Sequence, residues 1–276
     1  MIHTLAAISA LVLITQGLTL TRPIKVTDTY LLQGTSRQIT RMTTVDARGV
    51  RQQPTDGTIS VRLDATCTVE GVTEDGQEAI KSLLIRNAEA VVNQDPPNTL
   101  LTAGTRLKAS FSNQGTILEQ GDSLLSDQVT QLLSSVIRGE GGSHTGTLMN
   151  PDRVVTVGDT WQPNLPALNA LLQQSFNQQP DSVHGAVSYV AIDSSASQPS
   201  AVVRLSAQAT NVIDEFDGMR PSESTFSMTV TVHAPIDQRY PISRTETTTR
   251  LLMHFGEGPG SVLLEIINES QASFLR

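Results

Sequence analysis

The segment from Asn150 to Trp161 carries the most motif-like chemistry in this 276-residue chain. It reads Asn-Pro-Asp-Arg-Val-Val-Thr-Val-Gly-Asp-Thr-Trp and contains the single tryptophan. We interpret Gly158-Asp159 as a turn that ends a short Val-rich strand, with the Asp159 carboxylate hydrogen-bonded to the turn backbone. An indole at this place either fills the core as an anchor or offers a platform for a ligand. We favour the anchor. Under the alternative interpretation, Trp161 is the candidate ligand-binding residue.

The five histidines show no pair at metal-ligand spacing. They are His3, His144, His184, His233 and His254. His233 and His254 lie late in two candidate strands and could meet across a sheet, but the sequence assigns them no acidic partner. We therefore expect exposed or half-buried strand histidines. A hydrolase whose histidine and carboxylate come together only in three dimensions stays open as an alternative function.

Other polar segments favour structural roles. Three carboxylates gather in Asp214-Glu215-Phe216-Asp217-Gly218, but they lack the alternating spacing of a calcium loop and predict a hairpin tip. The Gly-rich stretch 141–146 comes nearest to a nucleophile elbow, yet its second glycine is one residue too far on and no strand leads into it, so it predicts a linker. The sequence thus predicts no catalytic residue, no metal and no cofactor.

Period-two alternation dominates the chain and predicts β-strands. In Thr58–Glu70 the odd-numbered positions are apolar and the even-numbered ones polar, so one face is dry. Cys67 shares the apolar register and is expected to be a buried small hydrophobe. Further candidate strands are Ser222–Ala234, Val202–Ile213, Ile242–Phe255, Ser261–Asn268 and the strand-with-turn segment Ser110–Glu119.

Turn dipeptides between these runs predict antiparallel neighbours. They are Asp56-Gly57, Asp75-Gly76, Gln114-Gly115 and Asp217-Gly218. The polar run Arg244–Arg250 alternates Arg, Glu, Thr and Arg on a face that belongs in water. Its opposite face leads on to Leu251, Met253 and Phe255, which should point into the hollow of a curved sheet.

Two segments change to a helical period. Leucines, valines and isoleucine recur every three to four residues in Ser123–Arg138, which Asp122 or Ser123 can cap. Leu165–Phe176 shows a second apolar stripe, with Asn164 as the cap and Pro166 in the first turn. A set of antiparallel strands before two amphipathic helices and a second set after them predict an α+β, mainly β fold: a curved antiparallel sheet or open half-barrel with the two helices packed in its concave face.

The first residues predict export. The apolar run Ala6–Ile14 suits the core of a signal peptide, and Thr15 interrupts it well before the about 20 apolar residues of a membrane span. We assign residues 1–22 to the signal peptide, with no clear cleavage site, and residues 23–276 to one β-rich domain. The mature chain is expected in the periplasm or outside the cell and not to span a membrane.

Composition argues against nucleic-acid binding and against a fold held by disulfides. The net charge is −8, and the positive residues are scattered singly, so no nucleic-acid footprint is present. Cys67 is the single cysteine and cannot form an internal disulfide. The hydrophobic content of 38% can supply a core.

The Pro-x-x-Val-x-Val-Gly-Asp-x-Trp segment, together with the preceding strands and amphipathic helix, resembles uncharacterised exported bacterial proteins grouped as a domain of unknown function. The likeness covers most of the mature chain, and no catalytic residues are established for that family. The expected architecture also looks like the bacterial lipoprotein-carrier half-barrel, whose concave apolar face holds acyl chains.

The leading hypothesis is an exported, non-enzymatic envelope protein that binds an apolar or amphiphilic ligand, such as a lipid, in the hollow, or a partner envelope protein at the rim. Its basis is the absence of a catalytic set, together with more apolar strand faces than two helices can cover. Besides the hydrolase, a purely structural surface component remains an alternative.

Overall fold

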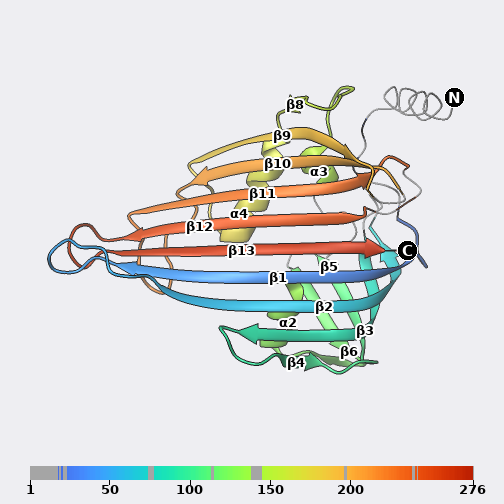
Figure 1. Cartoon of the computed structure of the whole chain (residues 1–276), viewed down its shortest axis with the longest axis horizontal. Helices are drawn as coiled ribbons and strands as arrows, with labels where there is room; N and C mark the ends of the chain where they lie inside the picture. The colour runs from blue at the N-terminus through green and yellow to red at the C-terminus, as the bar shows by residue number, and fades with distance from the viewer. Residues whose placement is uncertain are drawn as a thin grey trace.

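The computed structural model describes residues 18, 20, 24–73, 78–112, 115–137, 145–195, 198–237, 240 and 242–275. In these residues the chain forms one 13-stranded antiparallel sheet and three helices (Figure 1). The strands of the first half are β1 (Thr29–Thr44), β2 (Thr55–Val72), β3 (Glu78–Val92), β4 (Asn98–Leu101), β5 (Arg106–Ser112), β6 (Gly115–Gln120) and β7 (Ser123–Leu124). Those of the second half are β8 (Thr160–Trp161), β9 (Ser182–Asp193), β10 (Ser200–Thr210), β11 (Glu223–Pro235), β12 (Arg244–Phe255) and β13 (Val262–Leu275). The helices are α2 (Asp127–Ser134), α3 (Thr145–Met149) and α4 (Leu165–Phe176).

The sheet is open. Its order is β7-β6-β5-β3-β2-β1-β13-β12-β11-β10-β9-β8, with β4 beside β3. β1 and β13 come from opposite ends of the chain and pair over their whole length at the centre, from Leu31 opposite Leu275 to Thr44 opposite Val262. Each outermost strand has only two residues, and these strands do not pair with each other. The predicted curved antiparallel sheet is therefore confirmed.

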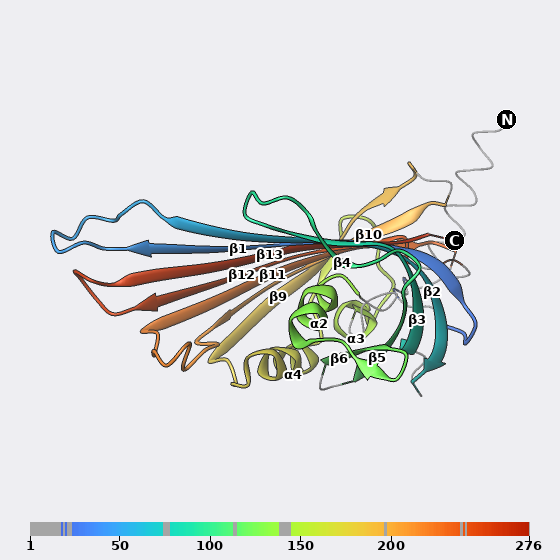
Figure 2. The ribbon, with the colours of Figure 1, turned by 90° about the horizontal axis from the view of Figure 1, so that it is seen from below.

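The three helices all lie on one face of the sheet, which we call the inner face, and β2, β3, β5 and β6 bend around them (Figure 2). The opposite face is the outer face. The alternation in β2 explains this polarity, because Leu63, Ala65 and Cys67 are fully buried on the inner side. In β12 the odd-numbered Leu251, Met253 and Phe255 are buried on the inner side, as the sequence predicted.

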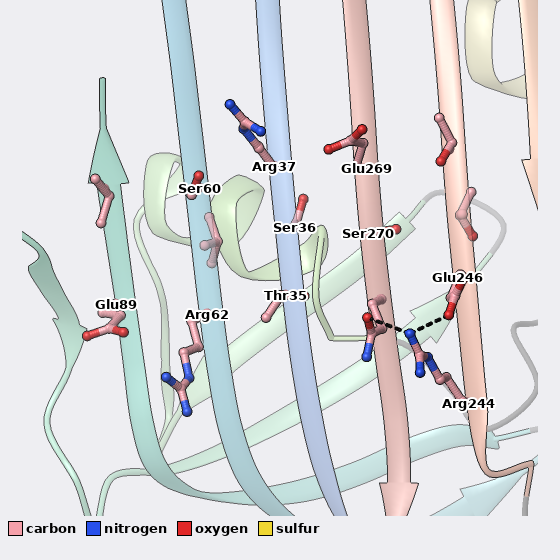
Figure 3. Close-up of a pocket in the computed structure, with 15 residues that line it drawn as sticks. Thr35, Ser36, Arg37, Ser60, Arg62, Glu89, Arg244, Glu246, Glu269 and Ser270 are labelled. Atoms are coloured by element: carbon pink, nitrogen blue, oxygen red, sulfur yellow. Dashed lines mark hydrogen bonds and ion pairs between the residues drawn. The ribbon is translucent and has the colours of Figure 1, made fainter. Parts of the chain in front are cut away.

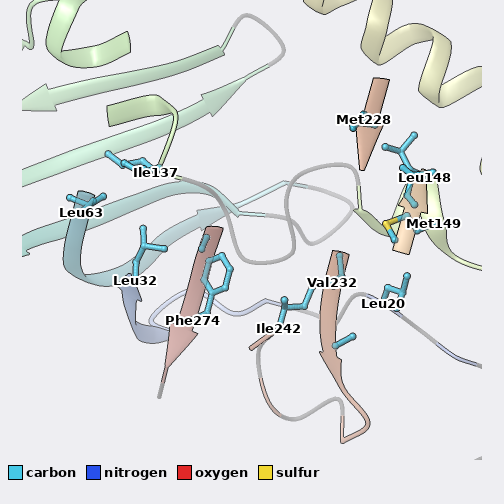
Figure 4. Close-up of a cluster of buried hydrophobic side chains, with 14 of the residues drawn as sticks. Leu20, Leu32, Leu63, Ile137, Leu148, Met149, Met228, Val232, Ile242 and Phe274 are labelled. Carbon is cyan, nitrogen blue, oxygen red and sulfur yellow. The ribbon is translucent and has the colours of Figure 1, made fainter. Parts of the chain in front are cut away.

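Leucines, alanines and aromatic rings from β1, β2, β10 and β13 form the core with the helices. Figure 4 shows one part of it, where Leu32, Leu63 and Phe274 of the sheet face Ile137, which follows α2. Gly34 lets α2 approach closely, since a Cβ at this position would lie 2.9 Å from the backbone oxygen of Val136. A larger residue at position 34 would push the segment that follows α2 away from the sheet.

α4 spans the residues predicted for it, and the Asn164 side chain accepts a hydrogen bond from Ala167 N at 3.2 Å, as a cap should. The first predicted helix is wrong at its start. Gly121, with φ of +62°, instead turns the chain into a hairpin, and Ser123 and Leu124 pair with β6. Helix α2 therefore begins only after its cap, Ser126. Arg138 lies outside the described residues.

The turn predictions were right only in part. Asp217-Gly218 has positive φ at both residues and closes a tight turn between Phe216 and Met219. Asp56-Gly57 is wrong as a turn, because Gly57 lies in β2 opposite Thr40. The chain reverses earlier, where the Asp46 carboxylate accepts hydrogen bonds from Arg48 N and Val50 N, both at 2.9 Å. Asp75-Gly76 and Gln114 lie outside the described residues, but β5 and β6 do pair around Gly115.

The Val-rich segment before Trp161 was predicted as a strand and is not one. Val154 and Val157 are 56% and 50% exposed, and the strand of this region is Thr160–Trp161 itself. Val157 and Gly158 form a turn, because Gly158 adopts φ of +96°.

Candidate functional site

The inner face is only partly covered by helices. At the end of the sheet where β1 and β12 finish and β13 begins, the strands extend past the helices (Figure 2). Inner-face apolar side chains cross four strands there, and we call them the apolar strip: Val92, Ile59, Met42, Ile266 and Leu264. Val92 and Met42 are 46% and 45% exposed, whereas Ile59, Ile266 and Leu264 are half-buried.

The strand registers place these residues in two groups, Val92 with Ile59 and Met42 with Leu264 and Ile266, because Ile59 lies opposite Gln38 and Met42 lies opposite Thr55. Val92 lies opposite Ile59, and Met42 lies opposite Leu264, which in turn faces Met253. Ile266 faces Leu251 in the adjacent row. The strip is thus continuous with the buried apolar residues of β12, and one end of it is open to solvent.

On β1, β13 and β12, polar side chains lie between the helix-covered core and the apolar residues nearer this end of the sheet, and they continue the row of Val92 and Ile59. We call these polar side chains the polar belt, and its residues are Ser36, Gln38, Thr247, Thr249, Asn268 and Ser270. The Asn268 amide donates a hydrogen bond to Thr249 Oγ at 3.5 Å across two strands. Along the inner face of β1 and β13, the side chains therefore change from buried and apolar to polar and then to partly exposed and apolar.

The outer face carries a polar groove of about 490 Å³ that crosses β3, β2, β1, β13 and β12 (Figure 3). Its charged lining residues are Arg37, Arg62, Glu89, Arg244, Glu246 and Glu269. Arg244 forms an ion pair with Glu246 and donates to the Gln271 side chain at 3.2 Å. The pattern of alternating charges along β12 hinted at this face, but the groove arises from strands that are distant in the sequence.

Next to the groove, an ion-pair ladder crosses the outer face. Arg41 donates two hydrogen bonds to Asp56, at 3.0 and 3.1 Å, and lies 3.4 Å from Glu265. Arg250 pairs with the other oxygen of the nearly buried Glu265. The ladder ties β2, β1, β13 and β12 together, in agreement with the water-facing side predicted for β12.

Trp161 is 8% exposed, and its indole N–H donates to the Met149 carbonyl at 3.0 Å. These contacts are those of an anchor between β8 and α3. Its role as a ligand platform stays a prediction.

Asp159 holds the preceding turn, as predicted. Its carboxylate accepts a hydrogen bond from Thr156 N at 2.7 Å, and this contact is the main reason that its pKa lies below the usual value. The Thr156 hydroxyl and Arg153 lower the pKa further. Because the pKa is depressed in the fold, this contribution to stability is present above the ordinary carboxyl pKa and is lost as the pH falls through the folded value.

His233 and His254 do not meet. His233 lies opposite Arg244 and His254 opposite Glu223, at opposite ends of the β11–β12 pair. His233 instead lies 3.5 Å from Asp193, an acidic partner that the sequence did not assign.

The His233–Asp193 pair does not form a catalytic triad with the nearby serine. The Ser195 hydroxyl donates to the Asp193 carboxylate, the contact that does most to lower the pKa of Asp193, and not to the imidazole. In the part of the chain that the structure describes, no three His, Cys, Asp or Glu side chains gather closely enough to hold a metal ion. His144 lies outside that part, as does the loop over residues 138–144.

A buried polar cluster lies in the core at the other end of the sheet. Lys81 is fully buried, with its ammonium 3.1 Å from the Tyr30 hydroxyl and 3.5 Å from Glu78. The Tyr30 hydroxyl donates to Glu78 at 2.8 Å, and the ammonium lies 5.0 Å from the centre of the Phe111 ring. Sequence reasoning missed this cluster, although Lys81 stands in an apolar register of β3 and could have indicated it.

Cys67 packs beside this cluster and is fully buried, as predicted. Burial raises its pKa to about 11. At pH 8 only about one thiol in a thousand would be ionised.

We therefore expect Cys67 of the native protein to resist an aromatic disulfide reagent at pH 8 and to react at once in denaturant. The release of the coloured thiolate, followed by absorbance, measures this. Stoichiometric labelling of the native protein within minutes would contradict the buried, neutral thiol.

Within the described residues, no helix has the length and apolar character needed to cross a membrane. No family model matches this chain, and no curated protein matches it. A solved structure concerned with lipid-protein interactions in lipovitellin aligns with 87% of this chain at 8% identity and a TM-score of 0.32. The aligned region covers 25% of that lipovitellin chain. A likeness at this level does not establish a shared fold or a shared ligand.

Proposed function

We propose that this chain is an exported, non-enzymatic protein that binds an amphiphile with one apolar chain on the inner face of its sheet. The observation that carries the proposal is the apolar strip, which extends beyond the helices and leaves Val92 and Met42 almost half exposed. An apolar surface of this kind, continuous with the core and bordered by polar groups, is typical of a ligand site.

The order of surfaces along the strands favours an amphiphile over a purely apolar ligand. An apolar chain lying on the strip would remove Met42, Ile266 and Leu264 from water, and each buried methylene contributes about 0.8 kcal/mol. The amide groups of Gln38 and Asn268 in the polar belt would then bind the polar end.

Export to the periplasm or the outside of the cell is part of the proposal and rests on the apolar run Ala6–Ile14. Leu20 is buried in the core, and its N–H donates to the Asn150 side chain at 3.0 Å. Signal cleavage before Leu20 would keep this contact, whereas cleavage after residue 22 would remove it.

The test is binding of a fluorescent fatty acid to the wild type and to Met42→Glu. We expect saturable binding to the wild type and at least about tenfold weaker binding to the variant, because a charge on the strip must be desolvated under the chain. Met42 is 45% exposed, so the variant should keep its melting temperature.

Thr43→Glu is the matched control, since it adds the same charge one residue further on, on the outer face. We expect its affinity to equal that of the wild type. Equal affinity of Met42→Glu and the wild type, or no saturable binding at all, would show that the strip is not the site.

A further inference from the structure

We propose that the outer-face groove binds a small zwitterion, a ligand whose anionic group and primary ammonium group lie a few ångströms apart. The source could be a free amino acid or peptide, or the head group of a lipid. This site lies on the other side of the sheet from the apolar strip and does not depend on the proposed function.

Charge is separated across the groove. Arg37 and Arg62 lie on adjacent strands as diagonal neighbours, because Arg37 faces Ser60 and Arg62 faces Thr35. Glu269 and Glu246 form the same diagonal on β13 and β12, facing Thr248 and Gln271. Arg37 and Arg62 thus lie on one side of the groove and Glu269 and Glu246 on the other, while Glu89 faces Arg62 and Arg244 pairs with Glu246 at the two ends.

Two of these charges are not neutralised within the described part of the chain. Arg37 and Glu269 lie opposite each other on β1 and β13, and both are exposed. No ion pair within 4.0 Å joins Arg37 or Glu269 to another described residue. In Figure 3 the Arg37 guanidinium lies over the gap toward β2, away from Glu269. Glu246, by contrast, already pairs with Arg244, and Arg62 lies 3.4 Å from Asp64.

The lining chemistry fits a zwitterion with a primary ammonium. An arginine fork binds a carboxylate or phosphate through paired hydrogen bonds, and a glutamate accepts from an ammonium. No aromatic side chain lines the groove, so it lacks the cage that recognises quaternary ammonium groups. A ligand that bridges Arg37 and Glu269 gives each of these side chains a partner of opposite charge, within a groove of about 490 Å³.

The experiment is a calorimetric titration with O-phosphoethanolamine and with glycylglycine, with phosphocholine and inorganic phosphate as comparison ligands. We expect saturable binding of the first two and at least about tenfold weaker binding of phosphocholine and phosphate, the loss that corresponds to one charge-assisted hydrogen bond. Equal binding of phosphate would overturn the proposal, since it would reveal a simple anion site. No saturable binding of either zwitterion would overturn it too.

Arg37→Gln and Glu269→Gln should each weaken binding by about tenfold, whereas Arg48→Gln, at an exposed position outside the groove, should not. Unchanged affinity in both groove variants would overturn the assignment of the groove.

Vesicles of phosphatidylethanolamine in phosphatidylcholine identify the source of the zwitterion. Co-sedimentation that Glu269→Gln abolishes indicates a lipid head group, and binding of glycylglycine alone indicates a free zwitterion. Met42→Glu should leave these titrations unchanged, which separates this result from that of the fatty-acid experiment.

Discussion

Replacing Lys81 with Ala should lower the free energy of unfolding by about 3–5 kcal/mol. Lys81 is fully buried, and its ammonium lies 3.5 Å from the nearly buried Glu78 carboxylate. Without the ammonium, that carboxylate loses a charged partner in a medium that solvates charge poorly. The side chain also lies over the Tyr30 and Phe111 rings, so its removal leaves a cavity among β1, β3 and β5.

Denaturant unfolding followed by circular dichroism measures the change. Lys108→Ala is the matched control, because Lys108 is exposed on the neighbouring β5 and should change stability by less than about 0.5 kcal/mol. The double variant Lys81→Met and Glu78→Gln removes both charges and should recover most of the loss. A loss below about 1 kcal/mol for Lys81→Ala would contradict the claim that the Lys81 ammonium stabilises the buried Glu78 carboxylate.

The second large effect is expected at Trp161. Trp161→Ala should cost about 3–5 kcal/mol, since it removes a side chain that is 8% exposed and leaves a cavity between β8 and α3. Trp161→Phe keeps most of the volume but loses the hydrogen bond to the Met149 carbonyl. Its cost should therefore be smaller: about 1 kcal/mol for the bond, with a further contribution from the smaller ring.

The same variants separate the anchor from the ligand platform. If Trp161 is an anchor, Trp161→Phe binds the fluorescent fatty acid as tightly as the wild type. Weaker binding by the folded Trp161→Phe variant would instead assign the indole to the ligand site. Thermal unfolding monitored at 222 nm supplies the stability measurement for both variants.

Sequence periodicity predicted well those strands that have one dry face. In β2 from Val61 to Val69 each inner residue is buried and each outer residue is at least partly exposed, so burial and hydropathy alternate together. The alternation is weaker in β11, where outer-face Thr231 is also buried. β1 was not singled out, because its middle is Gly-Thr-Ser-Arg-Gln and both faces carry polar residues there. It is held in place by its neighbours, through full-length pairing with β2 and β13. Such tertiary pairing is not encoded locally.

The errors at turns have a common physical cause. Asp56-Gly57 has the composition of a turn, but Gly57 is also compatible with an extended strand, and the Asp46 side chain stabilises the reversal earlier in the chain. Likewise, Leu124 fits the apolar period of the helix but is 70% exposed in β7, because the glycine at 121 has already set the chain into a hairpin. Local composition permits both outcomes, and the register of the sheet selects one.

The candidate sites were the least predictable part. The apolar strip brings together residues from β3, β2, β1 and β13, and the outer groove brings together five strands. Local sequence patterns indicate the apolar faces of these strands but not how far the helices reach along them. That the strands have more apolar surface than the helices cover was predicted, and the exposure of Met42 and Val92 agrees with it.

The most direct test of the amphiphile site is native mass spectrometry of the mature protein, purified gently from an exporting host, together with organic extraction of what it carries. We predict a stoichiometric adduct whose extracted mass is that of an amphiphile with an apolar chain, and its loss in Met42→Glu but not in Thr43→Glu. A clean apo mass for the wild type, repeated after incubation with a lipid mixture, would contradict the proposed function.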